Sequence, residues 1–68
     1  MYKFILIQDG NVYSETTNII DFDNEITTII LDNNLLSYQK IKETHLITLI
    51  LLIVNKLDFD ITIKKEDK

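Results

Sequence analysis

The sequence predicts a small α+β domain, in which an antiparallel or mixed sheet carries one helix packed on one face. Three observations predict this class. An Asp-Gly pair at residues 9–10 separates two β-rich segments, the stretch 46–54 contains eight aliphatic residues out of nine, and residues 57–64 alternate strictly between apolar and polar. The expected order of elements is a β-hairpin, a third strand, a long helix and a final strand, written ββ(β)αβ.

The N-terminal segment predicts the hairpin. Residues 2–8 are rich in aromatic and β-branched side chains and are apolar at both alternate sets, as expected of an interior strand with both faces covered. Asp9-Gly10 is a strong turn signal, because a type I′ turn needs positive φ at both central residues. The returning strand, residues 11–17, is mostly polar on both faces, which predicts an edge strand.

The next segment allows two interpretations. Residues 26–31 are an unbroken run of apolar or β-branched side chains, whose stiffness lowers helix propensity. We therefore predict a third strand over residues 25–31. The alternative is a helix, because Ile26, Ile29 and Ile30 also fit the i, i+3, i+4 spacing of a helical face.

A long helix is predicted from about Leu35 to Asn55, after a turn at residues 32–34 that supplies candidate N-cap residues. Its stretch 46–54 is shorter than the about 20 apolar residues that cross a bilayer. The stretch is also too apolar all round for an ordinary surface helix, so it needs cover beyond one sheet. We expect an oligomer interface formed by Ile47, Leu51, Leu52 and Val54. A strand over residues 46–54 is the alternative.

The C-terminal segment predicts a strand with one buried face and one solvated face. Its apolar set is Leu57, Phe59, Ile61 and Ile63, and its polar set is Asp58, Asp60, Thr62 and Lys64. Residues 64–68 are expected to form a frayed, charged tail. No linker or repeat divides the chain, so residues 1–68 are predicted to form a single domain.

The composition excludes several classes of function. The chain has a formal net charge of −4 and no Arg, and phosphate affinity depends on cationic side chains, so direct nucleic-acid binding is not expected. It has no Cys and one His, which leaves no Cys/His metal clip. No signal peptide or long apolar span is visible, which predicts a cytoplasmic protein without a membrane partner.

Two short motifs resemble catalytic or metal sites without their context. Residues 21–25 hold three carboxylates, but an EF-hand loop needs Gly and Glu where this chain has Ile26 and Asp32. Ser37 and Lys40 match the S-x-x-K pattern of penicillin-recognising enzymes, which also need partner motifs and a deep cleft. We therefore predict no enzyme, no metal and no cofactor, and interpret Ser37 as the start of a helix.

The charge distribution predicts an interaction surface. Residues 1–34 carry one lysine against six acidic residues, a net charge of −5, whereas residues 35–68 carry six lysines against five acidic residues, a net charge of +1. A compact anionic patch can steer a protein toward a basic groove and occupy it in place of phosphates. The residues predicted to contact a partner are Asp9, Glu15, Asp21, Asp23 and Glu25.

These features predict a small acidic binding protein that binds, and as an inhibitor blocks, a partner protein with a basic, nucleic-acid-handling surface. Residues with GC-rich codons are missing, which indicates an AT-rich genome. In size and composition the chain resembles accessory proteins of phages and mobile elements, including nucleic-acid mimics and anti-defence proteins. That resemblance implies action in the host cytoplasm and assigns no family. The alternative function is a self-associating structural or assembly subunit, with the apolar helix as a homodimer interface.

Overall fold

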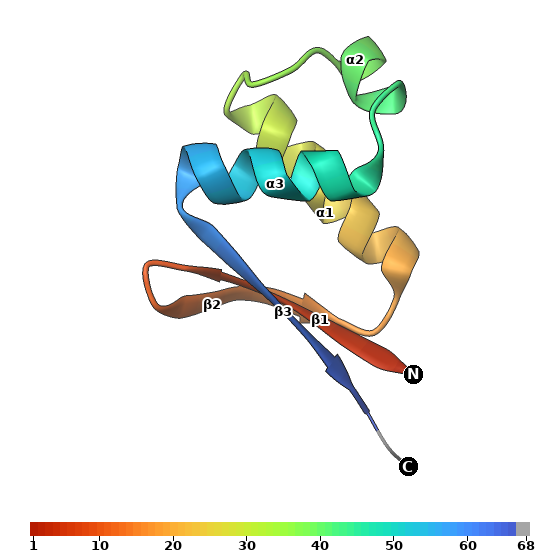
Figure 1. The fold of residues 1–68 in the computed structure, drawn as a ribbon, viewed down its shortest axis with the longest axis vertical. Coiled ribbons are helices and arrows are strands. Elements are labelled where there is room, and N and C mark those ends of the chain that lie inside the picture. Colours follow the sequence, from red (N-terminus) through yellow and green to blue (C-terminus); the bar gives the residue numbers. More distant parts are fainter. Residues whose placement is uncertain (67–68) are drawn as a thin grey trace.

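Three strands form one antiparallel sheet and three helices lie together on one of its faces in a computed structural model, which describes residues 1–66 (Figure 1). The elements are β1 (Tyr2–Gln8), β2 (Asn11–Thr16), α1 (Ile19–Asp32), α2 (Tyr38–Lys42), α3 (Leu46–Leu57) and β3 (Phe59–Lys65). The strand order is β2-β1-β3, so β1 is central and the predicted edge position of the second strand is confirmed. The α+β class predicted from the sequence is confirmed.

The β1–β2 hairpin turns at Asp9-Gly10, as predicted. Asp9 has φ 54° and Gly10 has φ 79°, so both central residues occupy the left-handed region that a type I′ turn requires. The strands pair in antiparallel register, with Leu6 opposite Ser14 and Ile7 opposite Val12. The register therefore skips Tyr13, which forms a bulge in β2.

We expect Gly10→Ala to lower the free energy of unfolding by about 1–2 kcal/mol, the cost of holding an L-residue in the left-handed region. The cost is conformational, because a Cβ added at this position meets no atom within 4 Å. Chemical denaturation followed by circular dichroism measures the loss. Gly10→Asn is the matched control and is expected to lose less, since Asn tolerates this region. Equal losses for both variants would contradict the type I′ assignment.

The central strand β1 has one covered face and one open face. Phe4 and Leu6 point toward the helices, and Leu6 is completely buried. Ile5 and Ile7 lie on the other face, where they are only half-buried. The prediction that both faces of this strand are covered is wrong, because no helix within residues 1–66 lies over the second face (Figure 1).

Charged side chains flank the open face. The ammonium of Lys3 lies 3.3 Å from a carboxylate oxygen of Glu15 and 3.5 Å from one of Glu66. The hydrogen bond with Glu15 raises the pKa of Lys3, and the nearby charge of Glu66 adds to the effect. Because the pKa of Lys3 is higher in the folded than in the unfolded chain, its contribution to stability is fully present below the unfolded pKa. That contribution is lost as the pH rises through the folded pKa. Lys3 therefore carries its charge at neutral pH, as both ion pairs require.

The segment predicted as a third strand is part of helix α1, so that prediction is wrong. Asn18 caps the helix, because its side-chain oxygen accepts hydrogen bonds from the backbone N–H groups of Ile20 (2.8 Å) and Asp21 (3.2 Å). The residues that the helix buries follow an i, i+4, i+7, i+8 spacing: Phe22, Ile26, Ile29 and Ile30. The burial of this stripe outweighs the modest helix penalty of β-branched side chains.

The predicted helix from Leu35 to Asn55 is divided into α2 and α3. Ser37, rather than residues 32–34, provides the first cap, with its hydroxyl accepting from the backbone N–H of Lys40 at 3.2 Å. This confirms the interpretation of Ser37 as a helix start. The break at residues 43–45 turns the chain back, so that Ile41 of α2 and Leu49 of α3 both enter the core.

The end of α3 lies two residues beyond the predicted one, at Leu57. Asp58 takes the left-handed conformation that was expected of Asn55, with φ 57°. The final strand therefore begins at Phe59, and Leu57 and Asp58 lie outside it. The predicted strand itself is confirmed.

The predicted frayed tail needs correction for residues 64–66. Lys64 and Lys65 pair with β1, opposite Lys3 and Tyr2 respectively. The backbone N–H of Glu66 donates to the carbonyl oxygen of Met1 at 2.8 Å. Residues 67–68, which the prediction also included, lie outside the described residues.

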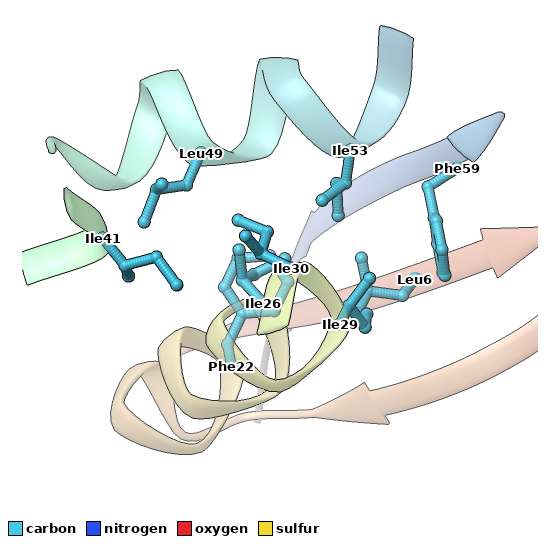
Figure 2. Packing of buried hydrophobic residues seen from close by; sticks show 9 residues of the cluster. All are labelled: Leu6, Phe22, Ile26, Ile29, Ile30, Ile41, Leu49, Ile53 and Phe59. Carbon is cyan, nitrogen blue, oxygen red and sulfur yellow. The ribbon is translucent and has the colours of Figure 1, made fainter. Parts of the chain in front are cut away.

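The core lies between the two layers (Figure 2). The sticks of Leu49 and Ile53 point from α3 toward the buried residues of α1, while Leu6 and Phe59 reach them from the sheet (Figure 2). The ring of Phe22 also stacks on Phe4 of β1, with ring centroids 4.8 Å apart. Helix α1 is thus the central element of the core and contributes four of its nine buried side chains.

Candidate interaction surfaces

The five acidic residues predicted as a partner-binding patch do not form one compact cluster. Asp9 lies in the hairpin turn, at the opposite end of β2 from the start of α1. Glu15 lies on the open face of the sheet, where Lys3 pairs with it. Asp21, Asp23 and Glu25 lie on α1 in the helical layer.

One flank of α1 gathers part of the predicted set with a residue that it missed. Asp21, Glu25 and Asp32 are spaced i, i+4 and i+11, which places them along one line of a helix with about 3.6 residues per turn. The carboxylate of Glu25 accepts a hydrogen bond from the hydroxyl of Ser14 in β2 at 2.5 Å. This flank therefore faces the β2 edge of the sheet. We call Asp21, Glu25 and Asp32 the acidic flank; Glu15 is not part of it, because it lies on the open face of the sheet.

Unbalanced negative charge concentrates on this side of the molecule. Helix α1 contains four acidic residues and no lysine, and three of the four lie on the acidic flank. Five lysines belong to α2, α3 and β3: Lys40, Lys42, Lys56, Lys64 and Lys65. Asp21 also lies in the first turn of α1, where the partial positive charge of the helix N-terminus stabilises it. The lysines of α2, α3 and β3 therefore lie on other elements than the one that carries the acidic flank.

Asp23 points to another side of α1. It lines a shallow depression between α1, α2 and α3, whose lining residues are Asp23, Asn24, Thr27, Tyr38, Ile41, Lys42, Thr44, Leu46 and Leu49. The ammonium of Lys42 lies 5.4 Å from the ring centre of Tyr38 in this region. Lys42 and Asp23 line the same depression, which is therefore of mixed charge and is not a continuation of the acidic flank.

The predicted oligomer interface divides between exposed and partly covered positions on α3. Ile47 is 64% exposed and Leu51 is 54% exposed, while Leu52 and Val54 are half-buried. Ile47, Leu51 and Val54 follow an i, i+4, i+7 spacing and form one stripe, which we call the outer stripe of α3. Leu52 lies off this stripe and packs against the core cluster. The apolar stretch 46–54 is therefore only partly sheltered by its own protomer.

The sequence signal for Asp32 was present but depended on the type of secondary structure. In a strand, residues 21, 25 and 32 do not share a face, because side chains alternate with a period of two. In a helix, the same three positions align. Assigning residues 25–31 to a strand therefore concealed the line of carboxylates.

Comparisons with protein-family models, curated proteins and solved structures found no match. No helix in the described part of the chain has the length and apolar character needed to span a membrane. Within residues 1–66, no group of three or more His, Cys, Asp or Glu side chains could hold a metal ion. The surfaces described above are therefore interpreted from their own chemistry.

Proposed function

We propose that the chain is a small, non-enzymatic binding protein that presents its acidic flank to a partner protein with a basic surface. The alignment of the three flank carboxylates on α1, a helix that contains no lysine, carries this proposal. An uncompensated negative side steers association with a positive groove and opposes association with other acidic surfaces. A partner that handles nucleic acid offers such a groove, and a protein bound in the groove prevents the phosphates of the nucleic acid from binding there.

This proposal includes the role of an inhibitor acting in the cytoplasm of a host cell, encoded by a phage or mobile element. Its support is the small size, the AT-rich coding and the acidic composition of the chain. The proposed contact residues are the three carboxylates of the acidic flank. Asp9, Glu15 and Asp23 lie outside it.

Reversing two charges of the acidic flank is expected to weaken binding of the partner by about tenfold or more at low salt. The variant is Asp21→Lys with Asp32→Lys, because both side chains are exposed. The matched control, Asp23→Lys with Glu43→Lys, makes the same change in net charge at exposed positions off the flank. The partner is captured from host lysate at low and high salt, and its affinity for each variant is then measured.

The pattern of affinities decides the proposal. The captured partner should be lost at high salt and displaced by duplex DNA, and the control variant should retain most of its affinity. Equal losses for flank and control variants would show that net charge alone acts. A partner retained at high salt with both variants would remove the acidic flank from the interface.

Self-association is a second candidate function, favoured by the exposure of Ile47 and Leu51 on the outer stripe of α3. Adjacent exposed aliphatic side chains on one helix face are typical of a protein–protein contact. Leu51→Lys is expected to shift a dimer to monomer, whereas Thr48→Lys, at an exposed position beside the stripe, should change little. Light scattering over a range of concentrations measures this. A wild-type chain that stays monomeric would exclude the second candidate.

A further inference from the structure

The outer edge of β3 is an open pairing surface. The sheet order β2-β1-β3 leaves this edge without a neighbouring strand among the described residues. Strand β3 is seven residues long, contains no proline or glycine, and pairs with β1 without a register shift. Edge strands are usually protected from pairing by bulges, prolines, short length or charged side chains. Strand β3 has none of the first three, and its charged residues Asp60 and Lys64 are of opposite sign.

The direction of the free backbone groups follows from one hydrogen bond. The N–H of Glu66 donates to the carbonyl oxygen of Met1 at 2.8 Å, which identifies this as a hydrogen-bonded pair. Such pairs alternate along an antiparallel ladder, so residues 60, 62 and 64 also direct their backbone groups toward β1. Residues 59, 61, 63 and 65 direct their N–H and C=O groups outward, to the free edge.

We infer that a second copy of this chain pairs with this edge, antiparallel and centred on Thr62, to form one continuous six-stranded sheet. This register places Ile61 of each copy opposite Ile63 of the other, so the outward backbone groups form the hydrogen-bonded pairs. Both residues lie on the helix-facing side of the sheet, and Ile63, which is 55% exposed, gains an apolar neighbour. The two-fold axis then runs perpendicular to the sheet.

The charges of β3 are self-complementary in this register alone. Asp60 of each copy lies opposite Lys64 of the other, in non-hydrogen-bonded pairs whose Cβ atoms are about 4.5–5.5 Å apart. The two nearest alternative registers that keep the same faces of the sheet together are shifted by two residues, one in each direction. One of them opposes Asp60 with Thr62, and the other opposes it with Glu66 of like charge. The pattern Asp-x-Thr-x-Lys therefore selects the register centred on Thr62.

The other edge of the sheet is unsuited to the same pairing. Strand β2 contains the bulge at Tyr13, and it borders the acidic flank. Two copies joined at β2 would bring two clusters of uncompensated carboxylates together. Pairing through β3 instead places the two acidic flanks at the far ends of the dimer.

Helix α3, which carries the outer stripe, lies over the β3 side of the sheet. Helix α3 packs over β3 and α1 packs over β2, and Figure 1 shows α3 and β3 in front of the other elements of their layers. A two-fold axis beside β3 therefore brings the two α3 helices toward each other. Pairing through the β3 edge specifies how two copies would associate in the second candidate function. This inference therefore rests on that function, the self-association of the chain.

Charge exchange across the strand pair tests the register directly. The dimer dissociation constant is measured by analytical ultracentrifugation for the wild type, Asp60→Lys, Lys64→Asp and the double variant, with circular dichroism to verify folding. Each single variant opposes like charges at two symmetric positions and should bind itself about tenfold more weakly. The double variant should recover wild-type affinity. A mixture of the two single variants should form a heterodimer, because every pair across the edge is then of opposite charge.

The outcomes separate the register from self-association itself. A wild type that remains monomeric overturns both. Suppose that Leu51→Lys dissociates the dimer, that the single charge variants leave its dissociation constant unchanged, and that their mixture shows no preference for the heterodimer. Helix α3 then remains an interface, and the β3 register is overturned. Ile63→Pro provides an independent variant, because it removes an outward N–H that the protomer does not use. It should dissociate the dimer while leaving a folded monomer, and an intact dimer would overturn the strand pairing.

Discussion

Replacing Ile26 with alanine is expected to lower the free energy of unfolding by about 2–5 kcal/mol. Ile26 is completely buried on the core face of α1, between the sheet and α3. A chain of 68 residues has about 3–10 kcal/mol of stability in total, at about 0.05–0.15 kcal/mol per residue. The variant should therefore have a substantial unfolded population at room temperature, which urea denaturation followed by circular dichroism will measure.

Ile20→Ala is the matched control for this experiment. Ile20 lies on the same helix but is 68% exposed, so the same deletion of methyl groups removes little buried surface. We expect its loss of stability to be below about 0.5 kcal/mol, as for most surface substitutions. Similar losses at both positions would contradict the helical assignment of this segment, because the helix is what gives the two side chains opposite environments.

The hairpin and the final strand could be predicted because their determinants are local. The Asp9-Gly10 pair fixes a turn whose backbone conformation few other residues adopt. Residues 57–64 alternate between apolar and polar, and the period of two alone identifies a strand with one covered face. Both features can be recognised without knowing the tertiary contacts that the rest of the chain makes.

Helix α1 could not be assigned from propensity, because its composition and its spacing conflict. The run of isoleucines and threonines after Glu25 favours a strand by side-chain stiffness. The spacing of Phe22, Ile26 and Ile29 favours a helix, and it prevails because the stripe fits between the sheet and α3. Propensity differences are a few tenths of a kcal/mol per residue, whereas burying one isoleucine side chain contributes about 1.5–3 kcal/mol.

The candidate interaction surface was predictable in composition but not in arrangement. The sequence placed the acidic residues in the N-terminal half, and they do concentrate in α1 and β2. Their grouping depends on side-chain direction, which the period of each element sets. Asp21 and Asp23 are two residues apart in sequence, yet their side chains are separated by a rotation of about 200° around the helix axis.

A second large effect is expected from Phe59→Ala, which should lower the free energy of unfolding by about 3–5 kcal/mol. Phe59 is 2% exposed at the start of β3, where its ring meets that of Tyr13 edge to face, with centroids 5.1 Å apart. The substitution removes a large buried side chain together with this aromatic pair. Thermal and urea unfolding of dilute protein measure the loss, and Phe59→Leu, which keeps most of the apolar volume, should lose much less.

The comparison of Phe59 with Ile63 tests how far the helical layer extends. Both residues belong to the apolar set of the same strand, so alternation alone predicts similar burial for the two. In the structure Ile63 is 55% exposed, because β3 continues beyond the helices (Figure 1). Ile63→Ala in dilute, monomeric protein should therefore cost below about 1 kcal/mol. A loss as large as that of Phe59→Ala would mean that the helices cover the whole strand, and the exposed end of β3 would then not be free to meet a second copy.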